Sequence, residues 1–474
     1  MEHLLIAYSW SVNNIGDMAI TPGLISSVKR LYPGTRISLL SNLTAGSDDF
    51  LTAKAWYAGH YPDIAVFPNP FVPPAGTDAP YLSAIAAKTW GKDASAYERG
   101  VLPFERSDEI THWIIDAFAD AVEAELGTYH ADFYACLDTV DAVMYNSGTT
   151  FNFGRGEPFP PKPGEDAADK RKFWDITLVR SMPLVLARKH GMPYAVNGQS
   201  FEALDHPSDC FFRTLFTDAQ FVSVRDPDSV DYLSGKGIGT GKLRFGPDST
   251  FFYPGEDTAW AKRFLAVHSL ADKGFISLII RTSVQGYITV QREQSHLSLL
   301  RDFITQWVTA ADMPVLLCPE VRIEIDVMRN EVYAKLPEAV RERCVFMDKF
   351  WSTAQAKAVY RASRIVVSME MHSVILALAA GTPVLHPQFA EAGRKASMLT
   401  ELGLGRWLFD IDHTTPYALF HAAMDISGSL DACAADIERS LARLAVLGEE
   451  NIRALAASAD ERRTADAAVC LSAV

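Results

Sequence analysis

A short polar run, S-M-E-M-H-S from Ser368 to Ser373, carries two titratable side chains in a setting that suits chemistry. Glu370 can hold a hydroxyl group or take its proton, and His372 can give or take a proton near neutral pH. The simpler alternative is that Glu370 only favours a helix N-terminus and that His372 only packs. Perturbed titratable groups in a cleft are usually functional, so we interpret this run, including Ser373, as part of a site.

The residues on either side of this run predict one β-α-β unit. Residues 365–367 are an apolar, β-branched run typical of a buried strand. Residues 374–380 are apolar helix formers that stop before Gly381 and Pro383, and the next strand is expected to follow at once. The polar run therefore lies where a strand ends and a helix begins, which is where ligands of open α/β sheets gather.

A second strand-to-helix loop lies near the N-terminus. Residues 4–8 predict a buried strand, and N-N-I-G-D follows at residues 13–17. Gly16 would allow a close approach of the backbone, Asp17 lies near a helix N-cap position, and Asn14 precedes both. A plain capped turn would also explain this loop.

Two further strand ends carry small or polar residues. The strand expected at 141–146 runs into S-G-T-T, which contains Gly148, and the strand at 194–197 runs into Gly198-Gln199-Ser200. We expect Gly148 and Gln199 to contact substrate at the same edge of the sheet.

Three cations also lie at expected element ends. Arg225 and Arg281 each follow a predicted strand, and Lys395 lies at the start of a predicted helix at 393–402. Guanidinium groups suit phosphate and carboxylate ligands, but they suit ion pairs equally well, so a salt bridge is an alternative role for Arg225.

The alternation of strands and helices occurs twice along the chain, which predicts an α/β protein with two parallel-sheet halves. We expect an N-terminal domain at 1–255, with an irregular insertion near 68–107, and a C-terminal domain at 256–415. A helical extension should occupy 416–474. The stretch 153–172 is rich in Pro, Gly and charge, and we interpret it as a surface loop that could act as a lid.

Composition excludes several classes of protein. The chain has 474 residues with 44 Lys and Arg against 58 Asp and Glu, a net charge of −14, which argues against nucleic-acid or anionic-membrane partners. Its six cysteines form no C-x-x-C pair and are expected to be reduced. The N-terminus does not resemble a signal peptide, no apolar run is long enough to span a membrane, and no metal-ligand spacing is evident. These features indicate a cytoplasmic protein without an integral membrane segment.

Several motifs appear together in a recognisable order: N-N-I-G-D-M-A-I, then F-V-S-V-R-D-P-D-S-V-D-Y-L with a later G-P-D-S-T-F-F, then S-M-E-M-H-S-V-I-L-A-L-A-A-G-T-P-V-L and a trailing lysine. With this set the chain resembles the polysaccharide pyruvyl transferase family over most of residues 3–410. The resemblance implies a GT-B-like fold of two Rossmann-like domains facing a cleft. It also implies transfer of a pyruvyl group from phosphoenolpyruvate to sugar hydroxyls in cell-surface glycan biosynthesis.

Under this resemblance phosphoenolpyruvate is the donor substrate and no cofactor is needed. The acceptor would be a sugar or glycan, which could be lipid-linked, and the chain itself could form a homo-oligomer.

The family typically shows Arg-x-His where this chain has Glu370-Met371-His372, so the histidine matches and the charge at position 370 is reversed. The resemblance implies that His372 is the general acid that protonates the methylene carbon of phosphoenolpyruvate. Glu370 would contact the acceptor, orient His372 or act as a base, and nearby cations would have to offset its charge. The residues expected to bind substrate are Asn14, Gly16, Asp17, Gly148, Gln199, Arg225, Arg281, Ser373 and Lys395.

Two other functions fit the same pattern. A GT-B glycosyltransferase would place the phosphates of a nucleotide sugar on a helix N-terminus and its ribose on Glu370. A glycan- or metabolite-binding relative that lost catalysis along with the arginine is the other alternative.

Overall fold

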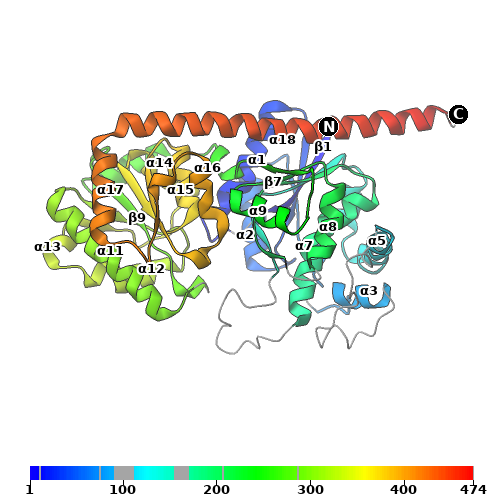
Figure 1. Cartoon of the computed structure of the whole chain (residues 1–474). Helices are drawn as coiled ribbons and strands as arrows, with labels where there is room; N and C mark the ends of the chain where they lie inside the picture. The colour runs from blue at the N-terminus through cyan, green and yellow to red at the C-terminus, as the bar shows by residue number, and fades with distance from the viewer. Residues whose placement is uncertain are drawn as a thin grey trace.

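The computed structural model describes residues 1–9, 12–73, 76–89, 112–153, 170–204, 208–285 and 288–472. Two α/β domains lie side by side, and the C-terminal helix runs along both of them (Figure 1). The lid expected at 153–172 lies outside the described residues except for its two ends, and so does most of the irregular insertion near 68–107 after residue 89.

The N-terminal domain is built on one sheet of parallel strands in the order β3-β2-β1-β4-β6-β7-β8, and β5 pairs with β6 off this path. Because all strands are parallel, their carboxyl ends meet at one edge. The strands are β1 (His3–Ser9), β2 (Arg36–Ser41), β3 (Ala65–Phe67), β4 (Ala142–Tyr145), β5 (Gly148–Phe153), β6 (Tyr194–Leu204), β7 (Val222–Val224) and β8 (Leu243–Phe245).

Helices cover this sheet, and their starts follow recognisable sequence signals. Asp226 caps α9 by accepting a 2.8 Å hydrogen bond from the Ser229 amide, with Pro227 at the first helical position. The helical segments are α1 (Asp17–Leu31), α2 (Asp48–His60), α3 (Leu82–Thr89), α5 (His112–Leu126), η2 (Gly127–Tyr129), α6 (Ala131–Leu137), α7 (Lys170–Lys189), α8 (Ser208–Asp218), α9 (Pro227–Gly235) and η3 (Ser249–Phe252).

The C-terminal domain has a second parallel sheet, in the order β11-β10-β9-β12-β13-β14. Two parallel sheets flanked by helices confirm the α/β class and the two Rossmann-like domains. Its strands are β9 (Ile276–Ile279), β10 (Val315–Leu317), β11 (Cys344–Phe346), β12 (Ile365–Ser368), β13 (Val384–Gln388) and β14 (Leu408–Asp410).

One helix of the second domain departs from the sequence prediction. The helix expected at 393–402 begins after Gly393, whose φ of +93° breaks it from the preceding turn. Residues 324–335 form a short α-helix followed by π and 3-10 turns. The segments are α10 (Thr258–Val267), η4 (Ser283–Gln285), α11 (Val290–Ala310), α12 (Glu324–Val327), η5 (Met328–Val332), η6 (Tyr333–Lys335), α13 (Glu338–Arg341), α14 (Thr353–Ala362), α15 (Met371–Ala379), η7 (Ala390–Ala392), η8 (Arg394–Ser397), α16 (Met398–Glu401) and η9 (Gly405–Trp407).

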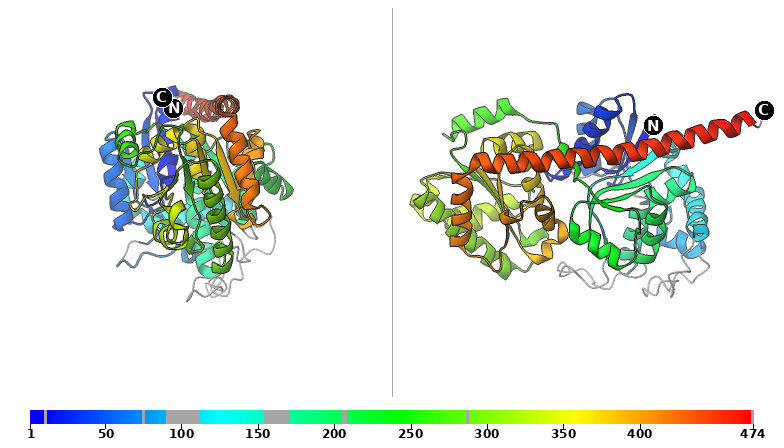
Figure 2. Two further views of the ribbon diagram at one scale, coloured as in Figure 1. Left: turned by 90° about the vertical axis from the view of Figure 1, so that its left-hand side faces the viewer. Right: turned by 45° about the horizontal axis from the view of Figure 1, so that its top comes forward.

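The last two helices connect the domains. Helix α17 (Pro416–Gly428) packs on α11, and α18 (Leu430–Ser472) then runs back across the N-terminal domain (Figures 1 and 2). Ile452, Leu455 and Ala459 of α18 are buried in the same apolar cluster as strand β1. The extension therefore completes the core of the first domain. The boundaries expected at 255 and 415 stay predictions.

Loops at the carboxyl ends of the two sheets are hydrogen-bonded to each other. The Ile15 amide donates to the Glu320 carbonyl at 3.1 Å, and the Arg322 amide donates to the Asn13 carbonyl at 3.3 Å. Thr353 donates its hydroxyl to the Ile15 carbonyl at 2.7 Å. The N-terminal loop is therefore fixed against the second domain.

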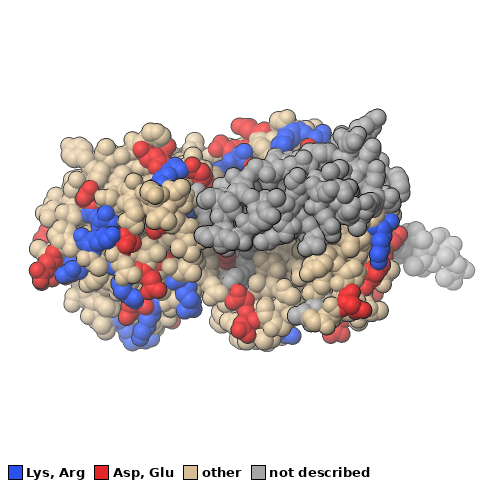
Figure 3. Space-filling view, turned by 90° about the horizontal axis from the view of Figure 1, so that it is seen from below, with Lys and Arg blue, Asp and Glu red and all other residues tan. Residues whose placement is uncertain are grey.

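Among the helices of the described ranges, none is both long and apolar enough to cross a bilayer. On the face seen in Figure 3, acidic and basic side chains are interspersed over the described surface.

Candidate functional site

His372 and Gly16 are in direct contact across the domain boundary. His372 lies in the first turn of α15, and a Cβ atom placed on Gly16 would fall 2.0 Å from the His372 Cβ. Gly16 has an ordinary helical φ of −73°, so a glycine is needed here for space and not for backbone freedom. The close approach expected at Gly16 is thus an approach to the imidazole.

Carboxylates from both domains surround one side of the imidazole. Nδ1 of His372 lies 3.6 Å from Glu320 Oε1 and 3.9 Å from Asp17 Oδ1. Burial lowers the pKa of His372, but Glu320, Asp248 and Asp17 outweigh this effect and raise it above its ordinary value. Nε2 is buried and has no hydrogen-bond partner within the described chain. The imidazole can therefore hold a proton near neutral pH and present it from Nε2.

Glu320 anchors this arrangement, and the sequence analysis did not select it. It follows β10, its carboxylate accepts the Ser373 amide at 2.6 Å, and its side chain is only 1% exposed. Burial raises the pKa of Glu320, but His372 and Ser373 lower it below the ordinary value. The signal that could have identified Glu320 is its place at a strand end, the same position that singled out Gln199 and Arg281.

Asp17 has the opposite balance, because burial raises its pKa to about 6 even though His372 opposes this. Its charge therefore changes close to neutral pH, beside the imidazole. The Asn14 side chain accepts the amides of Gly16 and Asp17 at 2.7 and 3.1 Å and so shapes the start of α1.

Glu370 forms a buried ion pair with Arg281. Arg281 Nη1 donates to Glu370 Oε2 at 2.9 Å, and the two side chains are 5% and 6% exposed. Glu370 is the N-cap residue of α15, but its side chain accepts no capping hydrogen bond, so capping alone does not explain it. Burial raises the pKa of Glu370, and Arg281 only partly opposes this. The reversed charge at position 370 is thus offset by a neighbouring cation.

Arg225 is bound within the protein. It is almost fully buried, is ion-paired with Asp248, and donates to Ser200 at 2.8 Å and Thr149 at 2.6 Å. The salt bridge considered as an alternative role for Arg225 is therefore present, and it is buried. Direct binding of the donor by Arg225 stays a prediction, and its charge is already balanced by Asp248.

Lys395, unlike Arg225 and Arg281, forms no ion pair with another described residue. No hydrogen bond or ion pair joins its ammonium group to any other described residue, and its side chain is half-buried. Burial lowers the pKa of Lys395 to about 8, with Arg281 acting in the same direction and Glu370 against it. Its neighbour Arg394 donates to the Phe201 carbonyl at 2.7 Å, which holds this turn against the first domain.

The other predicted residues, Gly148, Gln199 and Ser373, lie within the strands and the helix that surround the site. Gly148 begins β5 with φ +140°, and Gln199 lies inside β6, not in a loop after it. The Gln199 side chain is fully buried and accepts the Thr150 amide at 2.9 Å, and the Ser373 hydroxyl bonds Tyr360 at 3.0 Å. Both side chains are thus bonded within the protein, and direct contact of Gln199 or Ser373 with substrate stays a prediction.

Two kinds of chemistry are open to the described side chains of the site, namely proton transfer and ion pairing. Within the described ranges, no group of three or more His, Cys, Asp and Glu side chains could hold a metal ion. The imidazole of His372, whose pKa is raised, can protonate a bound molecule. The ammonium group of Lys395 and the guanidinium of Arg281, which is paired with Glu370, can hold an anion.

Two Rossmann-like domains with a site between them define the GT-B class of architecture. Residues 14–386 match the model of the family described as polysaccharide pyruvyl transferase, so the chain belongs to this family. A search of curated proteins finds no match.

Solved structures agree with this fold. UDP-GlcNAc 2-epimerase from Neisseria meningitidis is 9% identical with a TM-score of 0.51, and the match covers 96% of this chain and 99% of that one. UGT71G1 from Medicago truncatula is 11% identical with a TM-score of 0.50, over 96% and 98%. UDP-glucose: anthocyanidin 3-O-glucosyltransferase is 12% identical with a TM-score of 0.50, over 96% and 99%. At such identities the likeness shows the fold alone.

Proposed function

We propose that this protein transfers the pyruvyl group of phosphoenolpyruvate to two hydroxyl groups of a sugar, forming a ketal and releasing phosphate. Membership of the family supports the reaction class. The observation that carries the proposal is the imidazole of His372, which is flanked at Nδ1 by Glu320 and Asp17 and has Nε2 without a partner in the described chain.

In the proposed reaction, His372 donates the Nε2 proton to the methylene carbon of the donor, which becomes a methyl group. The neighbouring carbon becomes electrophilic, and the first sugar hydroxyl adds to it. The bond from this carbon to the phosphate oxygen then breaks, and the second hydroxyl adds to close the ketal. One hydroxyl proton restores His372, and the other leaves with phosphate.

Charge in the site assists this chemistry in two ways. Glu320 and Asp17 stabilise the imidazolium form of His372, which is the form that acts as the acid. Lys395, with Arg281 next to it, would hold the phosphate and carboxylate of the donor. Glu370, already paired with Arg281, would contact an acceptor hydroxyl through Oε1, which has no hydrogen-bond partner among the described residues.

The test mixes the protein with phosphoenolpyruvate and a panel of sugars and glycans and measures phosphate release. We expect release with at least one acceptor, a product heavier by a pyruvyl ketal, and loss of both in His372→Ala. His413→Ala is the matched control, because the His413 side chain is 83% exposed and outside the site. No release with any acceptor, or equal release by His372→Ala, would overturn the proposal. Binding of nucleotide sugars without any response to phosphoenolpyruvate would favour a glycosyltransferase instead.

The proposal also includes the location of the reaction, the kind of acceptor and the oligomeric state. Phosphoenolpyruvate is a cytoplasmic metabolite, so we place the reaction in the cytoplasm, with a sugar or glycan acceptor that could be lipid-linked. A homo-oligomer stays a prediction.

A further inference from the structure

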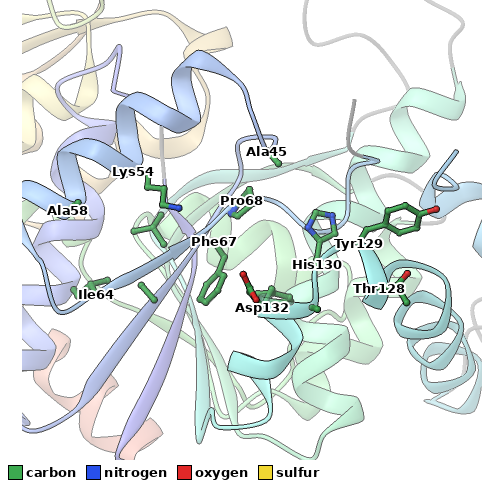
Figure 4. A pocket seen from close by; sticks show the side chains of 14 residues that line it. Ala45, Lys54, Ala58, Ile64, Phe67, Pro68, Thr128, Tyr129, His130 and Asp132 are labelled. Atoms are coloured by element: carbon green, nitrogen blue, oxygen red, sulfur yellow. The ribbon is translucent and has the colours of Figure 1, made fainter. Parts of the chain in front are cut away.

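A pocket of about 680 Å³ lies beside β3, an edge strand of the N-terminal sheet (Figure 4). Pockets that bind small molecules measure about 300–1,000 Å³. Three elements form the pocket: β3 with the residues after it, helix α2, and the η2–α6 segment. It is lined by Ala45, Lys54, Ala58, Ile64, Ala65, Val66, Phe67, Pro68, Thr128, Tyr129, His130, Ala131, Asp132 and Phe133.

Its lining combines one aromatic face with a few polar groups. The half-buried Phe67 ring is held edge-on by Phe133, with centroids 5.9 Å apart, and lies between Lys54 and Asp132 in Figure 4. No hydrogen bond or ion pair ties Lys54 or Asp132 to another described residue. Nε2 of His130 is buried and has no hydrogen-bond partner in the described ranges, and burial lowers the pKa of His130, so the ring is neutral at pH 7.

This combination suits an uncharged ring that carries hydroxyl groups. An apolar ring face can pack on Phe67, while a carboxylate, an ammonium group and a neutral imidazole can each bond a hydroxyl. Charges of both signs at the rim would favour neither an anion nor a cation alone. Sugar units have this chemistry.

The pocket includes the carboxyl end of β3, two strands away from the strand whose following loop contacts His372. In the sheet β3, β2 and β1 are neighbours, and strands lie about 4.8 Å apart, so the end of β3 is about 10 Å from the end of β1. The loop after β1 contacts His372 through Gly16, and in the same loop Asn13 donates to Asp49 at 3.0 Å.

A second hollow, of about 410 Å³, occupies the interval. It is lined mainly by polar residues after β2: Asn42, Leu43, Thr44, Ser47, Asp48 and Asp49. Polar groups that can bond hydroxyls therefore lie after β2, between the loop that contacts His372 and the pocket beside β3.

We propose that the pocket formed around Phe67, Lys54, His130 and Asp132 binds a sugar unit of the acceptor glycan, remote from the unit that receives the pyruvyl group. This inference rests on the proposed function in one respect, namely that the acceptor is a glycan of several units. A chain of sugars would extend from His372 along the carboxyl ends of β1, β2 and β3.

The test uses ladders of neutral malto-, cello- and manno-oligosaccharides of one to six units. Binding to the full chain is measured by saturation-transfer NMR and calorimetry, and phosphate release from phosphoenolpyruvate is recorded in parallel. The variants are Phe67→Ala and Asp132→Asn. Asp138→Asn is the matched control, because Asp138 is an exposed aspartate at the end of the same helix α6 and lies outside the pocket.

We expect affinity to rise with length for at least one ladder. Phe67→Ala and Asp132→Asn should weaken binding of the longer members about tenfold, with the single sugar and Asp138→Asn unaffected. Failure of every ladder to bind, no dependence on length, or unchanged binding in both pocket variants would overturn the inference. Length-dependent binding that the pocket variants weaken, without phosphate release, would leave the pocket standing and overturn only the proposed reaction.

Discussion

Nδ1 of His372 lies 3.6 Å from Oε1 of Glu320, while the other oxygen of Glu320 accepts the Ser373 amide at 2.6 Å. One buried carboxylate thus fixes the start of α15 and also favours the charged form of the imidazole. Glu320 acts on the reaction through His372, so we regard it as a positioning residue.

Glu320→Gln should move the pH dependence of the reaction. The acid form of His372 is lost as the pH rises through its pKa, and Glu320 raises that pKa, so the basic limb of kcat should shift to lower pH. An opposite charge at this range typically shifts a pKa by about 1–3 units, and we expect a shift of at least about one unit. The amide can still accept the Ser373 N–H.

Glu324→Gln is the control for this variant. Burial raises the pKa of Glu324 well above its ordinary value, and its carboxylate accepts the backbone amides of Glu320 and Val321, whereas no ion pair joins it to His372 in the described ranges. Its substitution should leave the basic limb in place. An unchanged limb in Glu320→Gln would contradict the role given to Glu320.

Lys395 should make donor binding depend on pH. Burial lowers its pKa to about 8, so the ammonium group is charged at pH 7 and loses its charge as the pH rises past 8. The KM for phosphoenolpyruvate should therefore rise above pH 8 in the native protein. Lys395→Met should raise KM about tenfold at pH 7, since a hydrogen bond to a charged group contributes about 1.5–3 kcal/mol. Lys395→Arg should remove the rise above pH 8, because a guanidinium stays charged.

Lys262→Met serves as the control for Lys395, because Lys262 is an exposed lysine on α10, the first helix of the second domain. A native KM that stays flat from pH 7 to 9 would rule out Lys395 as a donor ligand.

Gly16→Ala should disable the site through a steric clash. The added methyl group would lie 2.0 Å from Cβ and 2.4 Å from Nδ1 of His372, so the imidazole or the loop must move. A displacement of about 1 Å can reduce a rate about 100-fold, and we expect a loss of at least this size with a lower melting temperature. Gly34→Ala is the control, since no heavy atom lies within 4 Å of its added methyl group. Native kcat in Gly16→Ala would show that the contact with His372 is not needed.

Glu370→Gln should lower the stability of the protein without donor and increase the stabilisation that the donor provides. Removing one member of a buried ion pair leaves the other uncompensated and typically costs about 3–5 kcal/mol, so the melting temperature should fall. An anion bound beside Arg281 would restore the balance. The rise in melting temperature caused by phosphoenolpyruvate should therefore exceed that of the native protein. A rise equal to or below the native one would place the donor away from Arg281.

Much of the fold could be predicted from the sequence, because buried parallel strands are short apolar runs bounded by turn residues. The strand expected at residues 4–8 is found as β1 (His3–Ser9), and β12, α15 and β13 follow the predicted β-α-β unit. Strand β6 is longer than the strand expected at 194–197. Gly198 and Ser200 interrupt its apolar run, although the strand continues to Leu204.

The site was harder to predict, because its pairs join residues far apart in the chain. Glu370 and Arg281 are 89 positions apart, and nothing in either local sequence identifies the partner. The position of His372 could be predicted from the strand-end pattern, but the carboxylates around it could not. Glu320 lies at an equivalent strand end, where local sequence does not separate a ligand from a supporting residue.

The path of α18 across the N-terminal domain could not be predicted from the sequence either. An Ala-rich helical pattern shows which face is apolar but not which domain it covers. Leu455 is fully buried against the N-terminal domain, so Leu455→Ala should lower the free energy of unfolding by about 2–5 kcal/mol. Hydrogen exchange should show the loss of protection in β1 and β4, and urea should unfold the N-terminal domain first. Val446→Ala, on the same helix with Val446 57% exposed, should change the free energy by less than about 0.5 kcal/mol. Equal effects from the two variants would mean that α18 does not contribute to the core of the first domain.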